Sequence, residues 1–263
     1  IGEWHWGILA AETVAVLLIH VAANLSNDYF DFISGADQLS DADEGRPGRT
    51  LVTGIVTPQS VRNAILICLA AMAPLAVFLV HVGGWPVFGL GMFGVLSGYA
   101  YTGPPFRLKR HALGELCMIV TFGPAICFGA AWMQAKALSP SVLLLSWCPG
   151  ILVAAVLASN NLRDYEEDGA AGVRTLAQVL GRQAYVWVQI GLLLLPALLV
   201  VIGVIGGVAP DWSLLALVAL PAAVPPAQLA MKQLRRPDAD ALTARYLTAF
   251  DLLLAVGLII AQR

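Results

Sequence analysis

Long runs of apolar residues, separated by polar segments of unequal length, dominate this chain. A helix that spans the hydrocarbon core of a bilayer needs about 20 apolar residues. Eight segments approach or reach this length, so the pattern predicts an all-α fold, a polytopic transmembrane helical bundle. The predicted helices cover residues 5–27, 61–82, 86–101, 113–133, 140–161, 184–206, 212–231 and 243–261.

The segments between the predicted helices alternate in character. Long, polar segments cover residues 28–60, 102–112, 162–183 and 232–242, and short, nearly uncharged ones cover 82–86, 134–140 and 207–212. Of the 15 Lys and Arg residues, all but Lys136 and Arg263 fall on the side of the long segments. Because basic residues accumulate on the cytoplasmic side of a membrane, we expect the long polar segments to face the cytoplasm.

Composition supports the membrane interpretation, since 59% of the residues are hydrophobic and only 12% are charged. Soluble domains carry about twice that charged fraction. The formal net charge is −2 and the basic residues form no stripe, so no nucleic-acid partner is expected. The four cysteines lack metal-ligand spacing. We expect residues 1–263 to form a single transmembrane domain.

Residues 24–37 form the first of two polar stretches with candidate chemistry and read NLSNDYFDFISGAD. If the first helix continues through this stretch, Asn24, Asp28 and Asp31 follow the spacing i, i+4, i+7. Residues with this spacing project from one face of a helix. The first motif therefore offers two carboxylates and one amide at the polar end of a predicted membrane helix.

Residues 160–168 form the second stretch and read NNLRDYEED. Here Asn160, Asp164 and Asp168 follow the spacing i, i+4, i+8, which again places them on one helical face. The second motif lies on the same predicted side of the membrane as the first.

Carboxylates that converge at a membrane boundary are unfavourable unless a cation neutralises them. Mg²⁺ prefers oxygen ligands, keeps several waters and is commonly shared between carboxylates and substrate phosphates. One such motif alone would be more consistent with ordinary acids at a helix end, but two similar motifs on one side favour a metal site. The predicted Mg²⁺ ligands and catalytic residues are Asp28, Asp31, Asp164 and Asp168.

Basic side chains flank both motifs, and Arg and Lys bind phosphate oxygens well. Taken singly, each could equally be a membrane-surface charge, an alternative that is weakest for Arg49 and Lys109. The candidate diphosphate-binding residues are Asn24, Arg49, Lys109, Asn160, Arg163 and Arg174. Further candidates are Asn27, Asp37, Tyr101, Asn161 and His20. The simpler explanation is helix packing for His20 and an interfacial position for Tyr101.

Three blocks of the chain resemble the UbiA superfamily of intramembrane aromatic prenyltransferases, and in particular its 1,4-dihydroxy-2-naphthoate branch of menaquinone synthesis. They read NLSNDYFDFISGAD (24–37), YTGPPFRLKRHALGEL (101–116) and NNLRDYEEDGAAGVRTL (160–176). The resemblance covers nearly the whole chain. It implies a nine-helix bundle, of which eight helices are recognisable here and the first would precede Ile1.

The resemblance also implies a reaction, namely transfer of a polyprenyl group from polyprenyl diphosphate to 1,4-dihydroxy-2-naphthoate, giving demethylmenaquinone, CO₂ and diphosphate. Mg²⁺ held by the aspartates would neutralise the leaving group, and Arg49 and Lys109 would share its charge. Asn24 and Asn160 would orient ligands or metal-bound waters. Asp37 resembles the last position of the family's first motif.

Two alternatives stay open at this point. The acceptor could be 4-hydroxybenzoate, homogentisate or a lipid alcohol instead of the naphthoate. A different class, an ion-coupled transporter with intramembrane carboxylates, is less favoured because the acids gather at one surface beside basic loops rather than at the bilayer midplane.

Overall fold

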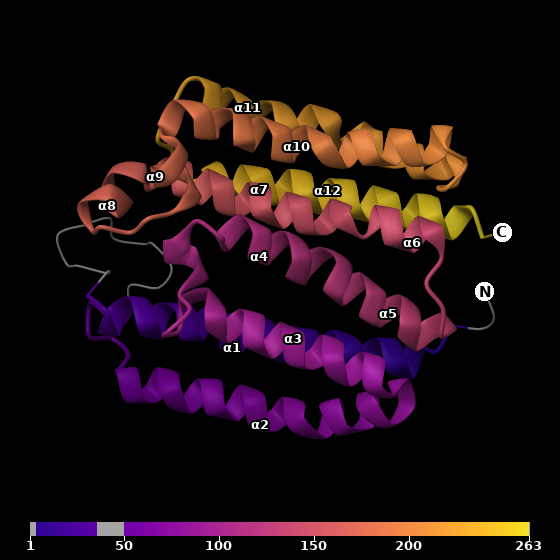
Figure 1. The fold of residues 1–263 in the computed structure, drawn as a ribbon, viewed down its shortest axis with the longest axis horizontal. Coiled ribbons are helices and arrows are strands. Elements are labelled where there is room, and N and C mark those ends of the chain that lie inside the picture. Colours follow the sequence, from indigo (N-terminus) through magenta and orange to yellow (C-terminus); the bar gives the residue numbers. More distant parts are fainter. Residues whose placement is uncertain (1–3, 36–49, 263) are drawn as a thin grey trace. The chain divides into compact units, whose positions relative to one another are not determined.

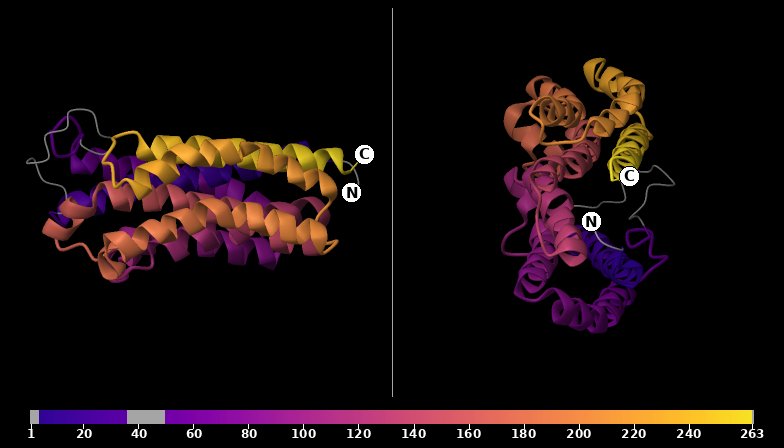
Figure 2. Two further views of the ribbon diagram at one scale, coloured as in Figure 1. Left: turned by 90° about the horizontal axis from the view of Figure 1, so that it is seen from above. Right: turned by 90° about the vertical axis from the view of Figure 1, so that its right-hand side faces the viewer.

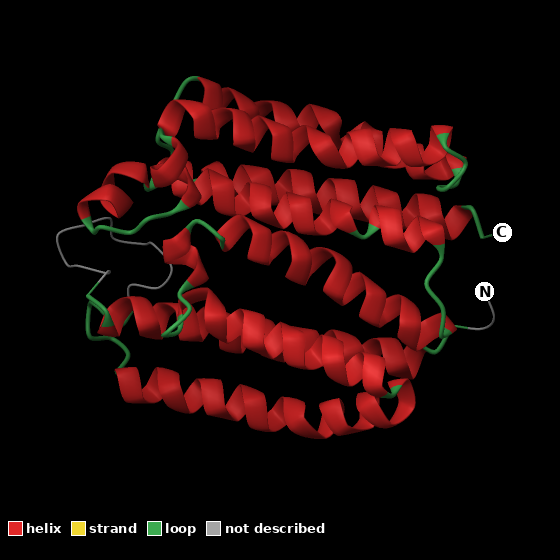
Figure 3. Cartoon of the chain, in the orientation of Figure 1, coloured by secondary structure: helices red, strands yellow, loops and turns green. Residues whose placement is uncertain are grey.

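The computed structural model describes residues 4–35 and 50–262, and nearly all of this part of the chain is helical (Figures 1 and 3). Strands are absent from these two ranges, which confirms the predicted all-α class. The chain divides into two compact units, one ending at Lys109 and one starting at Arg110. Within each unit the long helices run roughly along a common axis (Figure 2).

The first unit consists of α1 (Trp6–Ile33), α2 (Pro58–Gly83) and α3 (Trp85–Thr102), which pack against one another. Thr57 caps α2 by accepting a hydrogen bond from the Ser60 amide at 3.1 Å, and Pro58 occupies the first helical position, where its missing N–H costs nothing. Gly84, with φ +73°, lets the chain turn directly from α2 into α3. Consequently α1 and α3 end on the same side of this unit.

The second unit begins at Arg110, within the short 3-10 helix η1 (Leu108–His111), and contains five long helical segments. They are α4 (Gly114–Val120) with η2 (Thr121–Ala125) and α5 (Ile126–Ala135); α6 (Pro140–Leu145) with α7 (Trp147–Arg163); α10 (Arg182–Ile205); η3 (Asp211–Ala223) with α11 (Val224–Met231); and α12 (Ala239–Ile260). Two short helices, α8 (Tyr165–Ala170) and α9 (Leu176–Leu180), lie between α7 and α10. The segment η2 is a short π-helix that contains Pro124. Proline cannot donate the usual helical hydrogen bond, which accounts for this local irregularity.

Helix α7 is the centre of the second unit, where it packs against α4, α10 and α12. Small residues allow these helices to approach closely, as is common in membrane bundles. A Cβ atom added at Gly150 would lie 2.1 Å from the Ile119 carbonyl oxygen, so only glycine fits there. Close contact between helix backbones therefore fixes α7, the helix that carries the second motif.

All eight predicted helices are present, and seven of the helical segments are long and apolar enough to cross a membrane. The remaining one, α3, has 18 residues and is not among these seven. The predicted end of the first helix at residue 27 is wrong, because α1 continues to Ile33. Polar residues end the apolar run there without ending the helix. The single-domain assignment and the ninth helix stay predictions.

Candidate active site at two aspartate motifs

The first motif lies in the last turns of α1, which runs without a break to Ile33. The condition on which the one-face spacing of Asn24, Asp28 and Asp31 depended is therefore met. Asp31 is buried, with 8% of its surface exposed. Its Oδ2 atom accepts a hydrogen bond from Lys109 Nζ at 3.0 Å, in an ion pair that is largely shielded from solvent. The structure thus brings together two of the predicted site residues that are distant in sequence.

The loop after α3 places Lys109 beside Asp31. The Tyr99 hydroxyl donates to the Pro104 carbonyl at 2.6 Å, the Pro104–Pro105 peptide bond is cis, and Arg107 has a positive φ of 45°. Tyr99 also makes an edge-to-face contact with Phe30 on α1, with ring centroids 5.8 Å apart. The sequence GPPFRLK therefore forms a specific loop tied to the end of α1.

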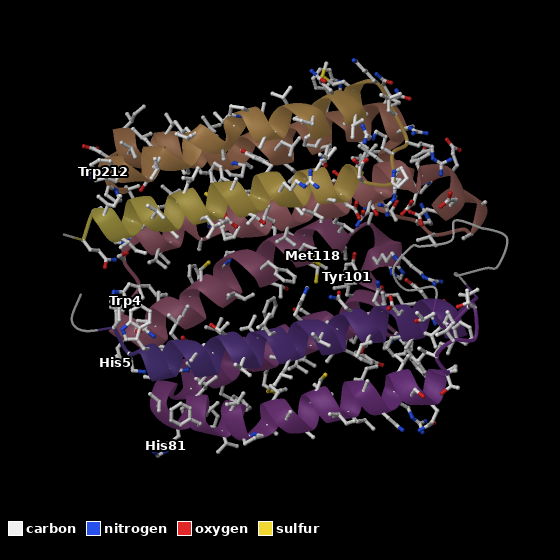
Figure 4. The ribbon with its side chains drawn as sticks, turned by 180° about the vertical axis from the view of Figure 1, so that it is seen from behind. Trp4, His5, His81, Tyr101, Met118 and Trp212 are labelled. Atoms are coloured by element: carbon white, nitrogen blue, oxygen red, sulfur yellow. The ribbon has the colours of Figure 1, made fainter. Side chains whose placement is uncertain are left out.

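Other predicted residues of the first motif lie on or near the same end of this unit. Asn24 Nδ2 contacts His20 Nε2 at 3.2 Å, so His20 supports the amide one turn before Asp28. Asn27 has a buried amide oxygen without a hydrogen-bond partner in the described ranges. Tyr101 is half-buried near the end of α3, whereas His5 and His81 lie at the opposite end of this unit (Figure 4). Two other predicted site residues lie outside the described residues: Asp37 and Arg49.

The second motif lies where α7 ends and α8 begins. Asp164, with φ −94° and ψ 11°, interrupts the helix between Arg163 and Tyr165. The one-turn spacing nevertheless persists, because the Asp164 amide donates to the Asn160 carbonyl at 2.9 Å and the Asp168 amide to the Asp164 carbonyl at 2.8 Å. The expected uninterrupted helical face is therefore replaced by two helical turns with a bend at Asp164.

Arg163 holds the Asp164 carboxylate in a two-pronged ion pair, with Nε–Oδ1 and Nη2–Oδ2 distances of 2.9 and 3.0 Å. Its remaining nitrogen, Nη1, lies 3.1 Å from Asp240 Oδ2 at the start of α12. Arg235, in the preceding loop, donates to the Arg163 carbonyl oxygen at 2.9 Å and to Glu167 at 2.8 Å. The planar pair of Arg163 with Asp164 has the strongest geometry available to Arg and a carboxylate. The contacts with Asp240 and Arg235 tie the end of α7 to the α11–α12 loop.

A buried polar network that we call the α7 clamp fixes the turn beside Asn160; it consists of Glu115, Asn161 and Tyr185. The Asn161 amide nitrogen donates to Glu115 Oε1 at 2.9 Å and contacts the Tyr185 hydroxyl at 3.2 Å, and that hydroxyl donates to the same Glu115 oxygen. All three side chains are buried. Asn161 therefore has a structural place in the second motif rather than a direct contact with the aspartates.

A second set of hydrogen bonds holds the preceding residue of α7. Ser159 Oγ lies 2.7 Å from Thr243 Oγ1 on α12 and accepts from Gln189 Nε2 on α10 at 2.9 Å. Asn160 lies between these two networks, and its buried amide oxygen has no hydrogen-bond partner within the described part of the chain. A buried unpaired oxygen is costly, which indicates that it accepts from or coordinates a ligand.

Arg174 and Asp168 are the remaining predicted residues of this motif. Arg174 is exposed, and its backbone carbonyl accepts a hydrogen bond from the Ala112 amide at 3.2 Å. Asp168 is half-buried one turn after Asp164. Of the two basic residues predicted beside this motif, Arg163 is thus the one that the structure places against a predicted metal ligand.

The residues of each motif fit Mg²⁺, although no group of three His, Cys, Asp or Glu side chains forms a ready-made metal site within residues 4–35 and 50–262. Mg²⁺ usually takes one or two protein carboxylates and completes its shell with water and substrate phosphate. Each motif offers two carboxylates together with a buried, unpaired amide oxygen, from Asn27 in the first and Asn160 in the second. Hard oxygen donors of this kind suit Mg²⁺ and exclude a soft-metal site.

Comparison with known proteins agrees with a helical membrane enzyme of this type. Residues 2–254 match the UbiA prenyltransferase family, so the chain belongs to that family and is an integral membrane protein. It is similar to 1,4-dihydroxy-2-naphthoate octaprenyltransferase of Bacillus subtilis (strain 168), with 29% identity over 97% of this chain and 82% of the relative. It is also 36% identical, over 66% of its length, to UbiA prenyltransferase domain-containing protein 1 of Gallus gallus, of which it spans about half (51%).

Solved structures show the same fold at low sequence identity. A UbiA homolog from Aeropyrum pernix K1 matches with a TM-score of 0.73 and 17% identity, covering 99% of this chain and 92% of its own. A UbiA homolog from Archaeoglobus fulgidus, solved bound to GPP and Mg²⁺, matches with a TM-score of 0.64 and 15% identity. The match covers 99% of this chain and 90% of that homolog. The predicted family and fold are confirmed.

Sequence reasoning missed the residues that position the motifs. Glu115 directly follows the start of a helix, where an acid is common for reasons unrelated to a site. Gln189 was the better signal, because a polar amide within a strongly apolar membrane segment usually has a specific partner. Asp240 and Arg235 offered no pattern, since their contacts with the second motif depend on the path of the α11–α12 loop.

Proposed function

We propose that this chain transfers a polyprenyl group from a polyprenyl diphosphate to 1,4-dihydroxy-2-naphthoate in a Mg²⁺-dependent reaction. The observation that carries the proposal is the pair of asparagine–aspartate motifs at the ends of membrane helices, each with a basic side chain on an aspartate. The family membership and the GPP and Mg²⁺ bound to the Archaeoglobus fulgidus homolog support this chemistry. The similarity to a naphthoate octaprenyltransferase supports the acceptor.

Mg²⁺ supplies charge neutralisation for a departing diphosphate. In the proposed reaction the prenyl C–O bond breaks and its electron pair leaves with the diphosphate. A ring carbon of the naphthoate then bonds to the prenyl carbon, the carboxyl group departs as CO₂, and the product is the reduced form of demethylmenaquinone. Asp28 and Asp31 in the first motif, and Asp164 and Asp168 in the second, would be the metal ligands, as the sequence predicts.

The basic and amide side chains have distinct proposed tasks. Lys109 and Arg163 would bind phosphate oxygens, because both already make charge-assisted contacts at the motifs. Asn24, Asn27 and Asn160 would orient metal-bound water or phosphate. The α7 clamp would hold Asn160 in register without touching substrate.

The surrounding membrane suits the donor substrate. An isoprenoid tail is apolar and dissolves among helices that face lipid, whereas its diphosphate needs the polar end where the motifs lie. The asymmetric distribution of Lys and Arg favours a cytoplasmic position for that end, in the bacterial inner membrane.

The proposed Mg²⁺ site is tested by replacing one carboxylate of each motif with its uncharged isostere, in the variants Asp28→Asn and Asp164→Asn. Each should lower kcat by at least about a hundredfold, the usual effect of removing one group that stabilises developing charge. Asp238→Asn is the matched control, because Asp238 is an exposed acid paired with Arg236 at the start of α12. Near-wild-type turnover in either motif variant, with protein that extracts and elutes normally, would overturn the metal site.

The acceptor is tested separately with purified protein, one radiolabelled prenyl diphosphate, and a panel of acceptors. We expect labelled product and CO₂ with 1,4-dihydroxy-2-naphthoate. Product with 4-hydroxybenzoate, homogentisate or a lipid alcohol instead would keep the prenyltransferase and reject this acceptor. Diphosphate release without an ion gradient separates an enzyme from an ion-coupled transporter.

A further inference from the structure

At each motif, a basic side chain forms an ion pair with one of the carboxylates that we propose as metal ligands. Lys109 Nζ lies 3.0 Å from Asp31 Oδ2, and Arg163 contacts both oxygens of Asp164 at 2.9 and 3.0 Å. We propose that Lys109 and Arg163 act as built-in counter-ions that make Mg²⁺ and diphosphate bind cooperatively, each ligand being bound weakly without the other. This inference rests on the proposed function.

The first step of the argument concerns the metal. The Asp31–Lys109 pair is mostly shielded, with side-chain exposures of 11% and 23%, and in the Asp164–Arg163 pair they are 24% and 15%. A metal ion that coordinates these oxygens must displace the ammonium or the guanidinium, or accept a like charge within a few ångströms. Shielded charges repel more strongly than charges in water, so the counter-ions oppose binding of metal alone.

The second step concerns the displaced cations. Once a metal takes the carboxylate, the Lys109 ammonium and the Arg163 guanidinium each lose one ion pair in a partly dehydrated site, which is unfavourable, while Arg163 keeps its contact with Asp240. A diphosphate supplies new oxygens for them. Conversely, a diphosphate that arrives without metal finds the cations already paired and the carboxylates repelling it.

Binding of both ligands therefore exchanges one set of ion pairs for another. Metal pairs with carboxylate and diphosphate pairs with Lys or Arg, so no charge is left without a partner. Such coupling is reciprocal, because if Mg²⁺ raises the affinity for diphosphate by a given factor, diphosphate raises the affinity for Mg²⁺ by the same factor. The arrangement would keep the site from being filled by free Mg²⁺ or by inorganic phosphate alone.

The Arg163 pair is anchored by further contacts. Arg163 also contacts Asp240 and the Pro237 carbonyl oxygen, so its guanidinium can turn toward a phosphate only if those contacts change. For this reason Lys109→Gln is the primary variant and Arg163→Gln the second. Lys109→Arg keeps the charge and should keep the coupling.

The experiment measures each ligand separately on the detergent-solubilised full chain. Mn²⁺ serves as the metal probe, and its binding without diphosphate is followed by electron paramagnetic resonance. Binding of ³²P-labelled inorganic diphosphate is measured by equilibrium dialysis at low and at saturating Mg²⁺. Arg236→Gln is the matched control, since Arg236 makes a similar two-pronged pair with Asp238, at 2.9 and 2.7 Å, outside both motifs.

Removing the counter-ion should move the two affinities in opposite directions. Lys109→Gln should bind Mn²⁺ alone about fivefold more tightly, in keeping with the energy of a partly shielded ion pair, and diphosphate about tenfold more weakly at saturating Mg²⁺. Arg236→Gln should match the wild type in both measurements, and Lys109→Arg should keep the dependence of the diphosphate affinity on Mg²⁺. A purely structural role for Lys109 would weaken both affinities together.

The inference is overturned if Lys109→Gln and Arg163→Gln bind Mn²⁺ no more tightly than the wild type, or if Mg²⁺ leaves the wild-type diphosphate affinity unchanged. These results differ from a failure of the proposed function, in which the wild type would bind neither Mn²⁺ nor diphosphate and would transfer no prenyl group.

Discussion

Replacing Tyr185 with Phe removes one hydroxyl from the α7 clamp and leaves the ring in place. That hydroxyl donates to the Glu115 carboxylate and lies 3.2 Å from the Asn161 amide nitrogen. A hydrogen bond to a charged group contributes about 1.5–3 kcal/mol to stability. The Asn161 amide keeps its own bond to Glu115 at 2.9 Å, so we expect a loss of about 2 kcal/mol.

Tyr246→Phe is the matched control for this substitution. Tyr246 is as fully buried as Tyr185, and both have 0% of their surface exposed. The Tyr246 hydroxyl, however, donates to a neutral acceptor, the Leu193 carbonyl oxygen, at 3.0 Å. Loss of a neutral hydrogen bond costs about 0.5–1.5 kcal/mol, roughly half the expected cost of Tyr185→Phe.

Thermal unfolding in detergent, followed with a thiol-reactive fluorescent maleimide, measures this difference. Cys148 on α7 is fully buried and would become reactive as the second unit opens. At about 2–4 °C per kcal/mol, Tyr185→Phe should lower the midpoint by about 4–8 °C and Tyr246→Phe by about half as much. An equal or larger shift for Tyr246→Phe would refute the view that the clamp holds a carboxylate.

Three further outcomes are expected. Asn160→Ala should reduce prenyl transfer about 10- to 100-fold, as loss of a metal-supporting side chain does. It should change the unfolding midpoint little, because the Asn160 amide oxygen has no partner within the described part of the chain. A large loss of stability would contradict this prediction. Gly150→Ala should cost about 1–3 kcal/mol or more, since the new Cβ would meet the Ile119 carbonyl at 2.1 Å, whereas Gly191→Ala on α10 should be tolerated because nothing lies within 4 Å; the same melting assay decides. Removal of divalent cations with EDTA should abolish turnover and added Mg²⁺ should restore it, and activity that survives exhaustive chelation would exclude the metal mechanism.

The helices were predictable because lipid leaves the backbone no alternative to hydrogen bonding within each segment. Their ends were less so, and α1 continues beyond residue 27 because the polar turn that carries Asp28 and Asp31 is still a helix. The break at Asp164 was not foreseen either. It lies beside tertiary contacts of Arg163 with Asp240 and Pro237, for which no local spacing exists.

The candidate site shows the same division. The aspartates and asparagines were recognisable because helical spacing collects them on one face. The contact of Lys109 with Asp31 joins residues 78 positions apart, and it depends on the loop that contains the Pro104–Pro105 cis peptide. Clustering of basic residues could suggest a phosphate site, but it could not show that Lys109 already holds one of the carboxylates.

The two motifs share one more feature, because both lie at the C-terminal end of a long helix, α1 ending at Ile33 and α7 at Arg163. The C-terminal end of a helix carries a partial negative charge from its aligned peptide dipoles. Many proteins bind phosphate at the positive N-terminal end of a helix, and these motifs present the opposite pole. The peptide dipoles of α1 and α7 therefore favour a cation over a diphosphate at these two ends, which agrees with the proposal that the aspartates there bind the metal.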